Sequence, residues 1–208
     1  MSDTRRLRRP LMVVAQALPF QSSGTSIVLR RLLENFAEDE VVLLARNPNP
    51  QMRLESHRLH YPTVRIPSLP GGLRGERYSR LAAVLPGIVA GLREIRRRRP
   101  AAIMAVFPDE ISLLTGYWLH RSTRRPLFAY FCDLYMEDRP GGWEKRLARW
   151  LQPRVFRAAS RIIAVNEGMA GYYRERYGMN ALCVPACINA NIPRPEPVPT
   201  PGNPFVVG

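Results

Sequence analysis

Short apolar runs alternate with amphipathic stretches along most of this chain. The runs lie at residues 11–18, 41–46, 63–67, 101–107, 127–135, 161–166 and 181–186. Continuous apolar runs of this length, rich in β-branched residues, are typical of strands that are buried on both faces of a parallel sheet. The pattern therefore predicts a strand in each run, with the segment at 63–67 carrying the weakest signal.

Between these runs, apolar residues recur three and four positions apart, which predicts helices. The segments with this spacing are 27–36, 78–99, 111–121, 143–160 and 167–178. Pro86 and Pro153 predict kinks in two of them, and Gly178 is a natural helix C-cap. Strands that alternate with helices predict an α/β doubly wound parallel sheet with helices on both faces. Such sheets bind ligands outside the carboxyl ends of their strands.

Composition divides the chain into unequal parts. Residues 1–10 form a basic tail, 11–192 carry the alternating pattern, and 193–204 place a Pro at nearly every second position. Alternating Pro makes a stiff, extended linker. The last residues, 205–208, are apolar and resemble the opening of a strand, so we expect them to be the stub of a second domain.

Charge limits the partners that the chain can have. It holds 208 residues, 31 basic and 17 acidic, with a net charge of +14, and every basic residue except Lys145 is Arg. The excess peaks at residues 5–9 and 96–99, which is compatible with anionic lipid, nucleic acid or phosphorylated ligands as partners. The alternative is that part of the Arg excess reflects genome composition and has no functional meaning. Because no RNP, helix-turn-helix or finger motif is visible, nucleic acid is not the expected partner.

The 46% hydrophobic content excludes a disordered polycation, and three Cys are too few for a disulfide scaffold. No apolar run reaches the ~18 residues that a membrane span needs. The short apolar stretch after the basic tail lacks a small-residue cleavage site, so a cytoplasmic protein is expected. The His and Cys residues lack partner residues at the spacing of metal ligands, so neither a metal nor a cofactor is expected.

Three loops at predicted carboxyl ends carry candidate chemistry. Ser23, Gly24 and Thr25 lie between the first strand and the first helix, where backbone N–H groups and small hydroxyls form an anion site. The alternative is an ordinary capped turn. Asp133 ends an apolar strand within an acidic set that also contains Asp109, and a carboxylate there can bind a sugar hydroxyl or act as a base. The alternative is that Asp133 caps a turn or pairs with an Arg.

The third loop contains Asn166 and Glu167, at a strand end that opens onto a helix. Asn166 can cap that helix and Glu167 suits its positive end, so a structural role is as well supported as a binding role. In helix 143–160, Trp150 falls among Arg residues that include Arg146 and Arg157. Basic residues beside an exposed aromatic ring suit a membrane interface, although a basic helix face is most often only solvated.

Three segments carry a family resemblance: ALPFQSSGTSIVLRRLLENF, FCDLY and VFRAASRIIAVNEGMAGYYRERYG. Together they resemble the N-terminal domain of a GT-B fold glycosyltransferase of the glycosyltransferase family 4 type. The third segment is the most specific, because Ala159-Ser160, Asn166-Glu167, Met169, Tyr173 and Tyr177-Gly178 stand where that family has similar residues. The resemblance covers residues 11–190.

The resemblance implies two Rossmann-like domains that face a cleft. The N-terminal domain holds a sugar or lipid-linked acceptor, and the C-terminal domain holds the nucleotide-sugar donor, here supplied in cis or in trans. Transfer in the family usually retains anomeric configuration and needs no metal. By resemblance, the loop with Ser23, Gly24 and Thr25 approaches the donor phosphates. The residues that would face acceptor or donor sugar are Asp109, Asp133, Asn166 and Glu167.

The chain departs from the family in two ways. Many members have a His near the position of Cys132-Asp133, so no catalytic His can be assigned and Asp133 becomes the catalytic candidate. The donor-binding domain is also absent from the sequence. We therefore expect an acceptor-binding half that is inactive alone, with a basic module for a protein partner or an anionic membrane as the alternative. Membrane contact would place it peripherally at the inner face of the membrane.

Overall fold

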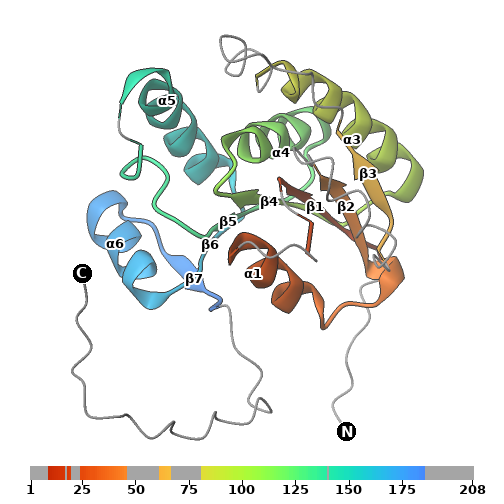
Figure 1. Cartoon of the computed structure of the whole chain (residues 1–208), viewed down its shortest axis with the longest axis horizontal. Coiled ribbons are helices and arrows are strands. Elements are labelled where there is room, and N and C mark those ends of the chain that lie inside the picture. The colour runs from red at the N-terminus through yellow and green to blue at the C-terminus, as the bar shows by residue number, and fades with distance from the viewer. Residues whose placement is uncertain are drawn as a thin grey trace, which may run out of the picture.

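The computed structural model describes residues 9–16, 18–19, 24–45, 61–66, 81–139 and 141–185. The basic tail up to residue 8, the Pro-rich linker at 193–204 and the segment 205–208 lie outside the described residues. What the structure describes is a sheet with helices packed on it (Figure 1).

Within these ranges, seven strands form one sheet in the order β3-β2-β1-β4-β5-β6-β7. They are β1 (Leu11–Ala15), β2 (Val41–Ala45), β3 (Thr63–Arg65), β4 (Ala102–Phe107), β5 (Leu127–Phe131), β6 (Arg161–Ala164) and β7 (Ala181–Cys183). All neighbouring strands pair in parallel. Each strand lies within a predicted apolar run, and the predicted α/β doubly wound, Rossmann-like class is confirmed.

The helices also follow the predicted spacing. They are α1 (Gly24–Leu33), α3 (Val84–Arg98), α4 (Glu110–Thr123), α5 (Gly142–Ala158) and α6 (Glu167–Tyr177). The short 3₁₀ helix η1 (Glu38–Glu40) was not predicted. The helical stretch at residues 81–82 is interrupted at Ala83, because Pro86 has no N–H to donate to the preceding turn. Pro153 lies inside α5, which continues on both sides of it.

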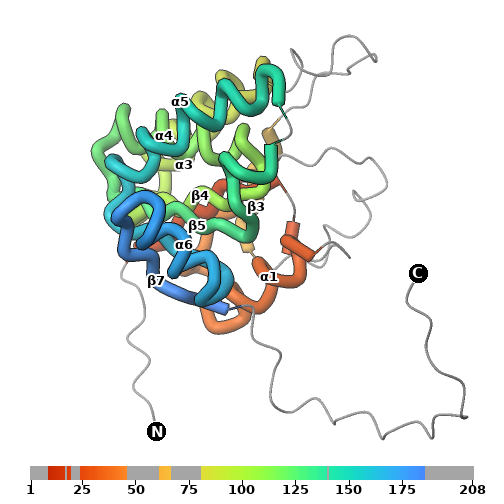
Figure 2. Tube along the Cα trace, turned by 90° about the vertical axis from the view of Figure 1, so that its left-hand side faces the viewer, coloured from red at the N-terminus to blue at the C-terminus, as the bar shows by residue number. Residues whose placement is uncertain are grey.

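Two hydrophobic cores cover the two faces of the sheet. Side chains of β1 alternate between them: Met12 and Val14 enter one core, and Leu11, Val13 and Ala15 enter the other. Helices α3 to α6 pack on the first core and α1 packs on the second. Figures 1 and 2 show α3, α4 and α5 side by side over one face, with α1 on the opposite side. A strand that is buried on both faces must be apolar throughout, as the sequence is.

Candidate functional site

The carboxyl ends of neighbouring strands lie in one row. Backbone hydrogen bonds continue the ladder beyond the strands: Cys132 N–H donates to Phe107 O (3.2 Å) and Val165 N–H to Phe131 O (3.1 Å). The loops after β4, β5 and β6 are therefore adjacent. The order of the strands reverses between β1 and β4, and ligands of open α/β sheets bind at this point.

Asp133 is exposed at this edge and lies two residues beyond the end of β5. Partial burial raises the pKa of Asp133, the nearby Asp138 carboxylate raises it further, and the Arg139 guanidinium lowers it. A carboxylate with a raised pKa accepts a proton more readily near neutral pH. The prediction that Asp133 is the reactive group of the site stays a prediction.

The loop that carries Asp133 is held at its far end by Arg139. The Nη2 atom of Arg139 donates to Pro108 O and to Glu110 Oε2, both at 3.2 Å. Its guanidinium carbon also lies 5.3 Å from the ring centre of Phe107 and 5.6 Å from that of Tyr135. Glu110 is only 1% exposed, so the ion pair is buried at the start of α4. This pair joins the loop after β5 to the loop after β4.

Further contacts fix the middle of the same loop. Glu137 Oε1 accepts hydrogen bonds from the hydroxyls of Tyr172 (3.1 Å) and Tyr177, both on α6. Met136 N–H donates to the buried Gln152 Oε1 (3.0 Å) on α5, and Lys145 Nζ donates to Met136 O. Contacts to three helices therefore preorganise the backbone that presents Asp133.

Asp109 has a different role from the exposed carboxylate. It is 1% exposed and caps α4, because its Oδ2 accepts from Ser112 N–H (3.0 Å) and from Ser112 Oγ–H (2.7 Å). Helix capping, a role that was not predicted for Asp109, accounts for this carboxylate. Its predicted contact with sugar stays a prediction.

Asn166 caps α6, as predicted. Its Oδ1 accepts from Met169 N–H at 2.8 Å, and the residue is exposed two positions beyond the end of β6. Glu167 is the first residue of α6 and is also exposed. The ladder between β5 and β6 places this pair beside the Asp133 loop. Asn166 can therefore cap the helix and still donate from its amide nitrogen to a ligand.

Gly24 begins α1, so the predicted phosphate-facing loop leads into a helix N-terminus. A Cβ atom built on Gly24 would meet nothing within 4 Å, and the residue is exposed. Thr25 is half-buried, and Ser23 lies outside the described residues. Open space at the first turn of a helix allows an anion to approach the backbone.

On α5, Arg146, Trp150 and Arg157 are all exposed, and their spacing places them on one helix face. The Arg154 guanidinium carbon lies 4.5 Å from the Trp150 ring centre. Tyr117 of α4 contacts Trp150 at 6.5 Å between ring centres, and it also contacts Trp118, which is 42% exposed. The aromatic surface therefore extends from α5 onto α4, which the sequence did not predict.

Other chemistry is limited in the part of the chain that the structure describes. No group of His, Cys, Asp or Glu there is arranged to hold a metal ion, and no helix there is long and apolar enough to cross a membrane. Burial raises the pKa of the Cys132 thiol to about 12, and the Asp133 carboxylate contributes to this shift. At neutral pH this thiol is protonated, so it is a poor nucleophile.

The sequence matches the family model of the glycosyl transferase 4-like domain over residues 23–185. No curated protein sequence matches significantly. The fold resembles HepE from Anabaena, solved with UDP and with UDP and glucose (TM-scores 0.62 and 0.59, 14% identity). It also resembles sucrose-phosphate synthase from Thermosynechococcus elongatus (0.61, 14%) and UDP-N-acetylglucosamine 2-epimerase from Rickettsia bellii (0.55, 13%).

These similarities cover 84–87% of this chain but only 44–48% of the other chains. The chain thus spans less than half the length of each of these four structures. At such low identity the likeness shows a shared fold, here one half of a GT-B fold, and an epimerase has that fold as well as glycosyltransferases. Activity must therefore be argued from the family match and from the residues of the site.

Proposed function

This chain belongs to the glycosyl transferase 4-like family, and from that premise we propose that it is the acceptor-binding domain of a retaining, nucleotide-sugar-dependent glycosyltransferase. One observation carries the proposal. Exposed Asp133 and Asn166 stand at the ends of the neighbouring strands β5 and β6, and the Asp133 loop is held by contacts to three helices. Preorganised polar groups at this edge are what a sugar site requires.

In this proposal Asp133 accepts a hydrogen bond from an acceptor hydroxyl and takes its proton as that oxygen bonds to the anomeric carbon of the donor sugar. The bond from this carbon to the nucleoside diphosphate breaks, the diphosphate leaves with its electron pair, and attack on the face from which it leaves retains the configuration. The raised pKa of Asp133 favours this role. Asn166 and Glu167 bind sugar hydroxyls, while Ser23, Gly24 and Thr25 face the donor phosphates. Asp109 contributes indirectly, because it caps α4 and so fixes the start of that helix beside this edge.

The donor-binding half is supplied in cis or in trans, which fits a chain that covers under half of HepE and of sucrose-phosphate synthase. The 208-residue chain alone then transfers sugar poorly, because most contacts to the nucleotide-sugar are missing. Incubation of the purified chain with UDP-glucose and saccharide acceptors should yield no robust transfer, and robust turnover would overturn this part. With both halves present, proton NMR of the product anomeric centre tests retention.

Saturation-transfer NMR with mono- and disaccharides tests the acceptor role. We expect saturation-transfer signals from one or more of these sugars with the wild-type chain. The same signals should be lost with Asp133→Asn. Asp39→Asn removes an equal charge from an exposed residue of η1 and serves as the matched control. Equal signals from Asp133→Asn and Asp39→Asn would remove Asp133 from the site.

A second candidate function is peripheral contact with an anionic membrane from the cytoplasmic side. The exposed stripe of Arg146, Trp150 and Arg157 supports it, because Trp and Arg together favour the lipid interface. The variant Arg146→Glu with Arg157→Glu should sediment less with anionic vesicles than Arg174→Glu with Arg176→Glu. Equal sedimentation of the two variants would exclude this face of α5.

A further inference from the structure

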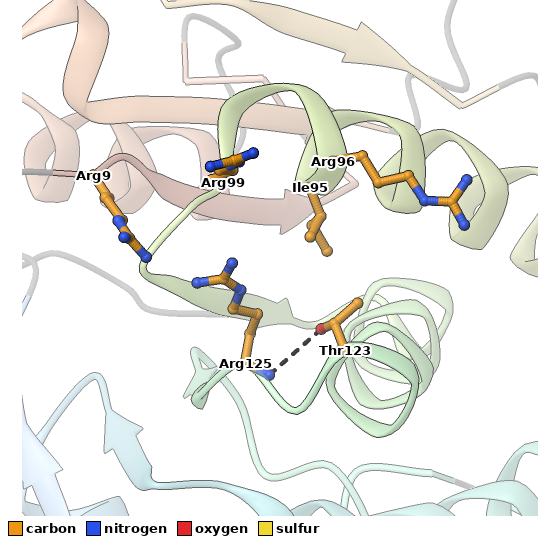
Figure 3. A pocket seen from close by; sticks show the side chains of 6 residues that line it. All are labelled: Arg9, Ile95, Arg96, Arg99, Thr123 and Arg125. Carbon is orange, nitrogen blue, oxygen red and sulfur yellow. Dashed lines mark hydrogen bonds between the residues drawn. The ribbon is translucent and has the colours of Figure 1, made fainter.

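A basic cavity lies at the opposite edge of the sheet, where the strands begin. Its volume is about 490 Å³, and its lining contains no acidic residue: Arg9, Ile95, Arg96, Arg99, Thr123 and Arg125. Figure 3 shows Arg9 and Arg125 pointing into a shared space near Arg99, while Arg96 extends away along α3. This edge is remote from the Asp133 loop, because all strands run parallel.

The sequence places these arginines by a repeated device. An Arg-Pro pair precedes each of three neighbouring strands: Arg9-Pro10 before β1, Arg99-Pro100 before β4 and Arg125-Pro126 before β5. Backbone hydrogen bonds align the pairs, since Ala101 N–H donates to Pro10 O (2.8 Å) and Ile103 N–H donates to Pro126 O (2.9 Å). Because neighbouring strands lie ~4.8 Å apart, the three Arg-Pro pairs begin within roughly 10 Å of one another across the sheet.

Ion pairs within the domain do not account for this cluster. Among the described residues, no carboxylate lies within ion-pair distance of Arg9, Arg96, Arg99 or Arg125. Glu94 is the nearest acid along α3, and it pairs instead with Arg97 (3.9 Å) and Arg98 (2.9 Å). Like charges that gather without a counter-ion repel one another, and a bound polyvalent anion would relieve that repulsion.

The negative ends of α3 and α4 also lie at this edge, and basic side chains often offset such ends. Here several terminal carbonyls already have other donors. Arg99 N–H donates to Ile95 O, Arg124 N–H donates to His120 O, and Thr123 Oγ1 donates to Leu119 O. Arg9 and Arg125 belong to neither helix, so helix ends alone do not explain why they line the cavity.

We propose that this arginine cavity binds a phosphate-bearing polyanion, either a free polyphosphate or the phosphate headgroups of an anionic lipid surface. The planar guanidinium donates two parallel hydrogen bonds to phosphate oxygens, and several such groups in one cavity favour a ligand with more than one phosphate. The site is separate from the proposed sugar site, and its failure would leave that proposal intact.

The test compares two variants of equal charge in the full chain. Arg9→Gln with Arg125→Gln removes two cavity arginines, and Arg174→Gln with Arg176→Gln removes two exposed arginines of α6 that do not line the cavity. Calorimetry at fixed ionic strength measures tripolyphosphate binding. Sedimentation measures binding to phosphatidylglycerol vesicles, with phosphatidylcholine vesicles as the neutral control. The cavity variant should lose about tenfold or more in affinity for at least one probe, and the control about twofold at most.

The two arms identify the source of phosphate. A selective loss toward tripolyphosphate indicates a soluble ligand, and a selective loss confined to vesicles indicates lipid headgroups. Equal losses in both variants, or no binding of either probe by wild type, would overturn the proposal. If the cavity variant does not fold, hydrogen exchange on the wild type replaces it. Bound probe should then slow exchange at residues 95–102 and 121–127, and protection confined to other segments would refute the site.

Discussion

The buried pair of Arg139 and Glu110 offers the sharpest energetic test of how the Asp133 loop is held. In Arg139→Met the side chain keeps apolar contact with Phe107 and Tyr135 but loses its charge. Glu110, 1% exposed, is then left without this cation, and breaking a buried pair in this way costs about 3–5 kcal/mol. The Arg139 side chain is only 19% exposed, so solvent screens the pair little.

Glu110→Gln in the same background removes the charge that Arg139→Met leaves behind. The double variant should therefore recover about 2 kcal/mol relative to the sum of the single variants. The remaining loss reflects the hydrogen bond to Pro108 O and the contacts with the two rings. Urea unfolding of the four proteins at pH 7 provides the free energies of unfolding that the cycle needs.

The same variant has a second consequence. Arg139 lowers the pKa of Asp133, so Arg139→Met should move the NMR titration of the Asp133 carboxyl carbon to higher pH. A loss below about 1 kcal/mol in Arg139→Met, with additive effects in the double variant, would refute the buried pair as the anchor of the loop. An unchanged titration of Asp133 would refute its electrostatic link to the site.

Three further tests address the packing and the titrating groups. Gly116→Ala should destabilise the domain by about 1–3 kcal/mol, because the new Cβ would lie 2.6 Å from Ala105 Cβ. Gly171→Ala should stabilise the domain by up to about 1 kcal/mol, because its Cβ meets nothing within 4 Å. Thermal unfolding that ranks the two variants the other way would contradict this packing. In a variant with Cys183 and Cys187 changed to Ser, Cys132 should react with iodoacetamide at pH 8 about a thousandfold more slowly in the folded than in the unfolded chain. The reason is that folding raises the pKa of the Cys132 thiol from 9.0 to about 12. Equal rates in the two states would rule out that shift. Burial and Glu137 raise the pKa of Tyr173, so its contribution to the free energy of unfolding is complete below pH ~10 and falls as the pH rises further. In urea unfolding above pH ~10, Tyr173→Phe should reduce the decrease in the free energy of unfolding by up to about 1.4 kcal/mol per pH unit. An unchanged slope of free energy against pH would contradict the raised pKa of Tyr173.

The strands could be read from the sequence because each is buried on both faces and apolar without interruption. The same signal predicted too long a strand at β5, because the predicted run continues to Tyr135 but the strand ends at Phe131. Tyr135 is buried because it packs on Phe107, 4.6 Å away between ring centres, and anchors the loop. Hydrophobicity reports burial, so it could not separate a strand residue from a buried loop anchor.

The site was predicted as a set of loops, and its supporting contacts were not. Glu110 and Arg139 are 29 residues apart, and Glu137 meets Tyr172 and Tyr177 across 35 and 40 residues. Such pairings depend on how helices pack, which one sequence does not show. The capping role of Asp109 was within reach, because an Asp three residues before Ser112 at a helix start is a typical N-cap.

In the proposed function, the carboxyl edge of this sheet faces the sugar and the donor phosphates. The most direct test is an amide NMR titration of the ¹⁵N-labelled chain with UDP-glucose up to about 10 mM, which detects the weak, millimolar binding expected of half a site. We expect shifts at Gly24 and Thr25, at Asp133 and at Asn166 to Gly168. Shifts confined to the arginine cavity at the opposite edge, or none at all, would contradict the claim.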